Sequence, residues 1–205
     1  AHSDLAGIAE NAGQLGIATQ DVVGFTDVIA KLGHTTNLSY DEASTALAQF
    51  LNVTGSGTGT VSNLASSIVA LGNNTAATEK DILMMSQRWA TTGAMIGLTD
   101  DQITAMSATL ISMGVNVEAG GSALQRFGQK VNSHVLDAGM DLEILAETAG
   151  VTATEFTNAW QNDPVNALEL FLKGLDGVVK EGGNANALLK DLGITSTQEL
   201  NALLA

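Results

Sequence analysis

The chain has 205 residues, no cysteine and one proline, and its 22 acidic and eight basic side chains give a formal net charge of −14. The absence of cysteine excludes disulfides and thiolate chemistry, and the negative charge argues against direct binding of a nucleic-acid backbone. No apolar run is long enough for a transmembrane segment. Aromatic residues make up only 4% of the chain, and its alanine- and leucine-rich composition favours helices over strands. We therefore expect an all-α fold without a sheet.

Apolar residues recur at spacings of three and four through most of the chain, which is the signature of amphipathic helices. The helix faces expected in the first two thirds run through residues 5–15, 22–32, 43–50, 64–71, 82–89, 103–113 and 124–131. Ser39-x-x-Glu42 and Thr99-x-x-Gln102 have the spacing of capping boxes at helix starts. Breaks arrive every ten to twenty residues, so we expect a compact multi-helix bundle of short helices rather than one long rod.

Glycines follow many of these apolar runs. A glycine just past a helix end adopts the left-handed conformation without a clash, because it has no Cβ. We expect six structural helix caps, most with positive φ: Gly16, Gly72, Gly97, Gly114, Gly150 and Gly193. Gly33 is expected to close the second helix in the same way. The spacing of the recurring glycine, apolar and Ser/Thr triplet is irregular and predicts no regular solenoid period.

Two features of the first half have competing interpretations. The glycine-rich stretch Thr54–Val61 lacks the Lys of a phosphate-binding P-loop, so we interpret it as a flexible connector. Met84 and Met85 are compatible with an adaptable partner groove, but packing in the core is the favoured interpretation.

From about His134 onward the expected helices become shorter, and the single proline appears as Asp163-Pro164, a typical helix start. The faces expected here run through residues 142–145, 156–160, 168–178 and 188–192, and Ser196-x-x-Glu199 caps a last helix. We expect a larger N-terminal helical part, residues 1–135, and a smaller C-terminal part, residues 136–205. Both ends look cut, so the chain is interpreted as a fragment of a longer protein.

No arrangement of residues typical of a catalytic site is present. The three histidines stand far apart in the sequence: His2, His34 and His134. Asp100-Asp101 and Asp141-x-Glu143 are close acidic pairs, but both lie near expected helix starts, where the helix dipole favours negative charge. We predict a protein that is not an enzyme, with no catalytic, cofactor-binding or metal-binding residue and no cofactor.

The order of several segments carries a resemblance. ALGNNTAATEKDI (residues 70–82), IGLTDDQITAM (96–106) and MGVNVEAGGSALQRF (113–127) follow one another as in the core region of phage tail tape-measure proteins. The segments at residues 37–55 and 149–175 resemble the regions of that family before and after the core, so the similarity covers nearly the whole chain. Each motif alone is weak, and their order and spacing together carry the specificity.

The resemblance implies a long helical protein that occupies the tail tube, sets the tail length during assembly and leaves before DNA passes. It implies a location in the virion tail, and in the host cytoplasm during assembly. The implied partners are other tape-measure copies, the tail tube protein and tail assembly chaperones. The alternative is an unrelated helical module that binds a partner helix in a groove. An enzyme with a novel site is a third, weaker hypothesis.

Overall fold

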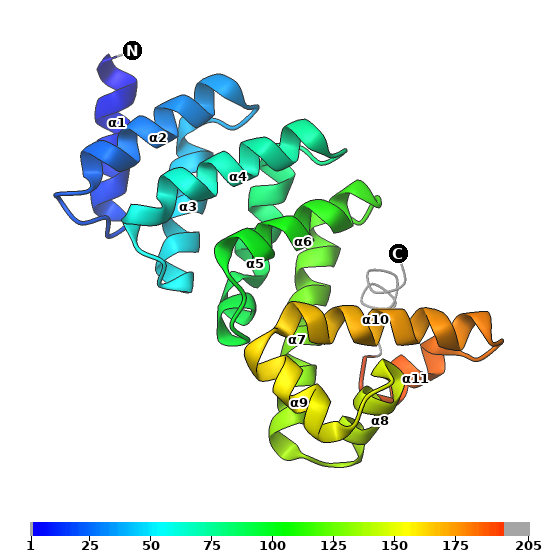
Figure 1. Cartoon of the computed structure of the whole chain (residues 1–205). Coiled ribbons are helices and arrows are strands. Elements are labelled where there is room, and N and C mark those ends of the chain that lie inside the picture. The colour runs from blue at the N-terminus through cyan, green and yellow to red at the C-terminus, as the bar shows by residue number, and fades with distance from the viewer. Residues whose placement is uncertain (1, 195–205) are drawn as a thin grey trace. The chain divides into compact units, whose positions relative to one another are not determined.

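A computed structural model describes residues 2–194, with side chains from residue 5 onward (Figure 1). Over this range the chain forms eleven α-helices and one 3-10 helix and contains no strand, which confirms the all-α prediction. The helix expected after Ser196 lies outside the described residues. The described residues fold as two compact units, residues 2–91 with 100–121, and residues 92–99 with 122–194. The separate division expected at residue 135 stays a prediction.

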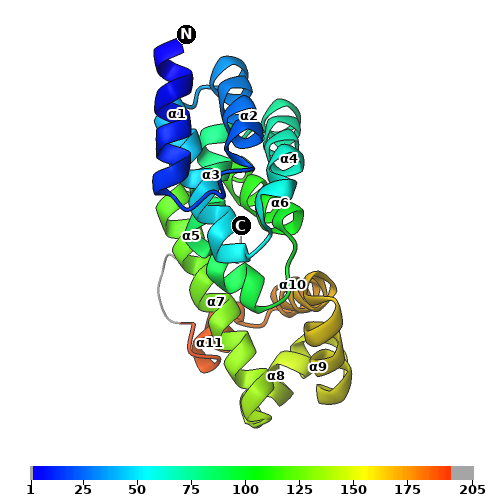
Figure 2. The same ribbon diagram turned by 90° about the vertical axis from the view of Figure 1, so that its left-hand side faces the viewer.

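The first unit is built from helical hairpins arranged in two layers (Figure 2). Helices α1, α3 and α5 form one layer, and α2, α4 and α6 form the other. Their bounds, with the short 3-10 helix and α7, are α1 (His2–Gln14), α2 (Val22–Thr35), α3 (Tyr40–Thr54), η1 (Thr58–Thr60), α4 (Val61–Asn74), α5 (Glu79–Met95), α6 (Asp100–Ser112) and α7 (Val117–Asp137). Both α5 and α7 begin in this unit and end in the other.

The space between the two layers is filled by large apolar side chains. Phe25, Phe50, Ile68 and Trp89 are each at most 1% exposed. The indole of Trp89 also donates a 3.0 Å hydrogen bond to Ser107 Oγ, which itself donates to the carbonyl of Ile103. The one buried indole N–H in this core is thereby satisfied, as a close-packed apolar environment requires.

The second unit packs three helices against one another and adds a fourth: α8 (Met140–Ala149), α9 (Ala153–Asn162), α10 (Pro164–Lys180) and α11 (Ala185–Asp191). Its core contains Phe127 and Phe171, whose ring centroids are 5.8 Å apart. Asp163 caps α10 by accepting a hydrogen bond from the amide of Asn166, and Pro164 occupies the first turn, as expected. At Gly174, α10 crosses α8 so closely that a Cβ would overlap the backbone of Thr148.

Five of the six expected glycine caps have the expected geometry. Gly16, Gly97, Gly114, Gly150 and Gly193 have φ values from 72° to 87°. The amides that follow turn back onto the preceding helix; for example, Val151 donates to the carbonyl of Ala146. This is the bonding pattern that satisfies the last carbonyls of a helix.

The expectations for Gly72 and Gly33 are wrong, because both glycines lie inside helices, in α4 and α2. The helices end two residues later, at Asn74 and Thr35, and the residues that follow, Thr75 and Thr36, have extended backbones with φ −129°. Both glycines lie against a side chain of the following helix, which a Cβ would displace. A Cβ on Gly72 would lie 2.6 Å from the carboxyl carbon of Glu79, and one on Gly33 would overlap the ring of Tyr40.

Candidate functional site

The acidic pair Asp100-Asp101 lies in the first turn of α6, and its two carboxylates bond to different parts of the chain. Asp100 accepts a 2.8 Å hydrogen bond from Ser56, whereas Asp101 accepts a 2.7 Å bond from Ser67 on α4. Each carboxylate joins α6 to a neighbouring segment. The pair therefore acts as two structural acceptors and does not form a two-carboxylate site.

The glycine-rich connector is fixed by hydrogen bonds at two points. Ser56 bonds to Asp100, and Thr58 donates a 2.5 Å hydrogen bond to the carboxylate of Asp21, the residue before α2. Residues Thr58–Thr60 form the short helix η1. The loop thus ties together the starts of α2 and α6, which its composition did not predict.

The two histidines with described side chains, His34 and His134, each have their own local partners. His34 Nε2 lies 3.3 Å from the hydroxyl of Tyr40. In the second unit, His134 Nδ1 lies 3.2 Å from Asp141, and its Nε2 lies 3.1 Å from the carbonyl of Leu192. The side chain of His2 is not among those described. Across the described residues, no group of three His, Asp or Glu side chains could hold a metal ion.

The second acidic pair is also structural in its placement. Asp141 and Glu143 lie in the first turn of α8, where the helix dipole favours negative charge. Asp141 bonds to His134, and Glu143 is exposed. Because Asp141 bonds to an imidazole and not to Glu143, the two carboxyl groups do not form an acid–base pair.

The strongest electrostatic perturbation lies at Glu42, in the capping box that starts α3. Its carboxylate accepts hydrogen bonds from Lys80 at 2.5 Å and from the amide and hydroxyl of Ser39. These bonds lower the pKa of Glu42 to about 2, Lys80 having the largest effect. In the second unit, the backbone N–H and hydroxyl of Thr152 lower the pKa of Glu155 in the same kind of capping box. Both carboxylates stabilise helix starts, and neither is held in the protonated form that a general acid needs.

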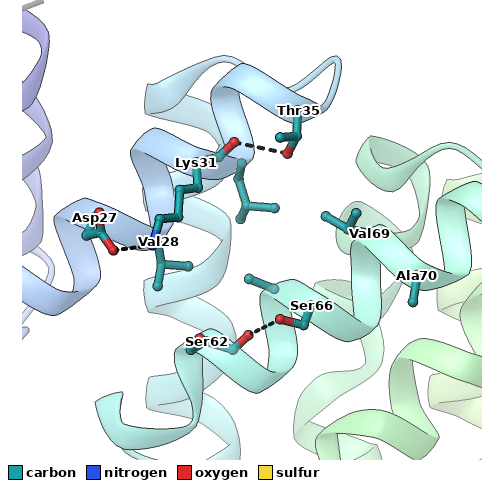
Figure 3. Close-up of a pocket in the computed structure, with 10 residues that line it drawn as sticks. Asp27, Val28, Lys31, Thr35, Ser62, Ser66, Val69 and Ala70 are labelled. Atoms are coloured by element: carbon teal, nitrogen blue, oxygen red, sulfur yellow. Dashed lines mark hydrogen bonds and ion pairs between the residues drawn. The ribbon is translucent and has the colours of Figure 1, made fainter.

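A shallow groove runs between α2 and α4 and encloses about 360 Å³ (Figure 3). Its apolar lining is provided mainly by Val28 and Leu32 from α2 and by Ala65 and Val69 from α4. Polar groups on its edges already bond within their own helices. Lys31 pairs with Asp27, Thr35 donates to the Lys31 carbonyl, and Ser66 donates to the Ser62 carbonyl.

A second hollow, of about 520 Å³, lies between α5 and the start of α7. The ion pair between Arg88 and Glu118 borders it, with 2.8 Å between nitrogen and oxygen, and Met84 lines it as well. Like the groove, it presents no set of free polar groups that converge on one point, which a substrate site requires.

The residues that sequence reasoning missed are those that join one hairpin to the next. Glu42 on α3 pairs with Lys80 on α5, and Gln49 on α3 bonds to Gln87 on α5. The two bonds join residues that are 38 positions apart. The signal that could have found them is a motif that occurs twice, Leu-Gly-x-x-Thr-x-x-Ser/Thr, at residues 32–39 and 71–78.

No helix in the described part of the chain has the length and apolar character needed to cross a membrane. No curated protein and no solved structure matches the chain significantly. The family model of phage-related minor tail proteins, in contrast, matches residues 1–193, which is nearly the whole chain. A helical protein with capped hairpins and no convergent polar site is compatible with a structural role in a phage tail. The chain belongs to the family of phage-related minor tail proteins.

Proposed function

We propose that this chain is a structural segment of a tape-measure protein, acting in tail assembly and in the determination of tail length. The observation that carries the proposal is the family match over residues 1–193 together with the order of the segments at residues 70–82, 96–106 and 113–127. The proposed partners of the protein are other tape-measure copies, the tail tube protein and the tail assembly chaperones. Its proposed location is the virion tail, and the host cytoplasm during assembly.

The charges of the first unit support a role without direct contact to DNA. Its three basic side chains, Lys31, Lys80 and Arg88, are each in an ion pair with a carboxylate of the same unit. A phosphate backbone would have to compete with these carboxylates for each cation, in a chain that already carries a net charge of −14. The proposal therefore includes no nucleic-acid binding and no catalysis by this segment.

The proposal is tested in a phage that encodes the chain. An in-frame deletion of residues 37–75 removes α3, η1 and α4, and electron microscopy of purified virions then measures the tail length. We expect tails that are uniformly shorter than those of the parent phage. Virions carrying Gly177→Ala, a substitution with nothing within 4 Å of the new Cβ, serve as the control with unchanged tail length. Deletion virions with tails of the parental length would contradict the proposal.

The alternative, a module that binds a partner helix, rests on the groove between α2 and α4. Val69→Asp places a charge in its apolar lining, and Asn63→Asp places the same charge on an exposed position of the same helix. If the groove is the functional site, Val69→Asp alone abolishes tail assembly although the purified variant stays folded. Equal assembly with both variants would contradict this alternative.

A further inference from the structure

We infer that the first unit is an array of copies of one 39-residue helical hairpin, and that residues 37–75 form a module that can be removed in register. The inference goes beyond the proposed function and does not depend on it. Helices α2, α4 and α6 begin at Val22, Val61 and Asp100, which are successive positions 39 residues apart. Helices α3 and α5 begin at Tyr40 and Glu79, again 39 apart.

The backbone before each second helix repeats at the same offset. Gly16 and Gly55 follow α1 and α3 with φ values of 85° and 70°. Asp21 and Thr60 then precede α2 and α4 with φ, ψ values of −101°, −11° and −93°, −8°. The residue before each of these two helices therefore has the same backbone conformation, with φ and ψ that agree within about ten degrees. The connectors differ at Gly57, which has φ 69°, whereas its counterpart Ala18 has no positive φ.

The turns that leave these helices are also equivalent. Thr36 and Thr75 have φ, ψ values of −129°, 177° and −129°, 174°. The hydroxyl of each accepts a 3.2 Å hydrogen bond from the amide two residues later, and that residue, Leu38 or Ala77, is buried. Ser39 and Thr78 then cap the next helix by accepting from the amides of Glu42 and Asp81.

The core repeats in position although its residues differ. Phe25 and Ile29 on α2 and Phe50 on α3 correspond to residues 39 positions later, and all of these residues are at most 1% exposed. The later residues are Leu64 and Ile68 on α4 and Trp89 on α5. At two other equivalent buried positions the side-chain size changes in opposite directions. Leu47 corresponds to the smaller Ser86, and Ala46 corresponds to the larger Met85. Such exchanges keep the core filled while they remove the sequence identity between the copies.

The match to a third copy is partial. Ile103, Thr104 and Ser107 of α6 are buried at the positions of Leu64, Ala65 and Ile68, so α6 keeps the register. The turn that follows is different: it contains Gly114 with φ 87°, and Asn116 accepts from the amides of Glu118 and Ala119. The helix starts therefore keep the register of 39 residues from α2 to α6. The connector before α6 does not keep it, because its positive-φ glycine is Gly97 and not residue 94, the position equivalent to Gly55.

In an array of this kind each hairpin contacts mainly its neighbours, so stability is close to a sum of local terms. Deleting residues 37–75 joins Thr36 to Ala76. Thr36 then occupies the position of Thr75 in the turn before α5, and the capping residue Thr78 is unchanged. Helix α2 then takes the place of α4 beside α6. The deletion removes the bonds from Ser56 and Ser67 to α6, so we expect the melting temperature to fall while folding remains cooperative.

The test uses purified protein and a probe in the first unit. With Trp160→Phe as background, the only tryptophan is Trp89, which is 1% exposed in the folded unit. The matched control deletes residues 37–60, which removes α3 and η1 but retains α4, so that two helices of the same layer follow each other. We expect blue-shifted emission from Trp89 and a cooperative melt for the deletion of 37–75, and red-shifted emission without a cooperative melt for the control.

Red-shifted emission from both deletions would overturn the inference, because the 39-residue unit would then not be exchangeable. A native-like signal from both would also overturn it, since the register would not matter. These readouts concern the fold of the purified chain, whereas the proposed function is tested by tail length. A deletion protein that folds but leaves the tail length unchanged would therefore contradict the function and support the array.

Discussion

Helices α10 and α8 of the second unit approach each other closely at Gly174, which allows a direct test of the packing there. A Cβ at Gly174 would lie 2.6 Å from the carbonyl carbon of Thr148, and closer still to its oxygen. Ordinary van der Waals contact begins at 3.4 Å, so α10 and α8 must move apart by at least about 0.8 Å. Both partners are helix backbone, which cannot rotate away as a side chain can.

This separation would loosen the packing of α10 against α8 and of the neighbouring side chains Leu145, Phe171 and Leu175, which are at most 2% exposed. Overpacking typically costs 1–3 kcal/mol, and we place Gly174→Ala at about 3 kcal/mol because backbone meets backbone. Alanine gains up to about 1 kcal/mol in helix propensity, which is too little to reverse the sign. We therefore expect a net loss of about 2 kcal/mol or more in the free energy of unfolding.

The assay is urea unfolding followed by the fluorescence of Trp160, in a Trp89→Phe background that removes the signal of the first unit. The matched control is Gly177→Ala, one turn along the same helix, where a new Cβ meets nothing within 4 Å. That control should be neutral or gain up to about 1 kcal/mol. A Gly174→Ala protein as stable as the parent would refute the close approach of α10 to α8.

Three further predictions concern the backbone and one carboxylate. Gly97→Ala should lower the free energy of unfolding by on the order of 1 kcal/mol in thermal melts, because φ is 85° and no atom blocks the new Cβ. Ala138→Gly should raise it by up to about 1 kcal/mol, because Ala138 is held at φ 49° after α7, and no gain would contradict the strain. The pKa of Glu42 is lowered from 4.5 to about 2 on folding, so its stabilising effect is present above pH 4.5 and is lost as the pH falls toward 2. Glu42→Gln should flatten the acid side of the stability profile in this window, measured by urea unfolding at each pH, and an unchanged profile would contradict the bond to Lys80.

The positions of the helices follow from the sequence because the spacing of apolar residues decides them. The face expected through residues 22–32 lies in α2, and the one through residues 168–178 lies in α10. The helix starts at Ser39, Thr152 and Asp163 are also where their capping residues indicate. Both signals are local, so they can be interpreted without knowing which helices pack together.

The glycines and methionines show where local reasoning stops. Gly33 and Gly72 resemble caps in sequence, but they lie inside helices, and the first residues of α3 and α5, seven positions further along the chain, pack against them. Met85 is fully buried, and its Cε occupies the space where Gly120 would carry a Cβ, whereas Met84 is partly exposed and lines a hollow. These roles depend on helix pairs that the sequence does not specify directly.

The repeat is hard to predict from the sequence for a related reason. The glycines that resemble caps have irregular spacing, and the short motif at residues 32–39 and 71–78 is a weak signal. Most of the 39-residue register lies in helix starts, turn dihedrals and burial. A buried pair such as Leu47 and Ser86 has no similarity in side chain, although both residues are fully buried. Geometry is conserved between the hairpins where residue identity is not.

The two-layer arrangement has a consequence for how much length each residue can measure. As one continuous helix, 39 residues would span about 58 Å, at a rise of 1.5 Å per residue. Packed helices lie 8–10 Å apart, so a folded hairpin advances the array by only about 10 Å. A ruler that kept these hairpins folded would thus measure about one sixth of the length that its residues could span. Under the proposed function, a tail shortened by about 10 Å on removal of one hairpin would mean that the array stays folded along the tube. A shortening near 58 Å would mean that the hairpins open into a single helix, with the tube wall covering the apolar faces that the two layers now cover for each other.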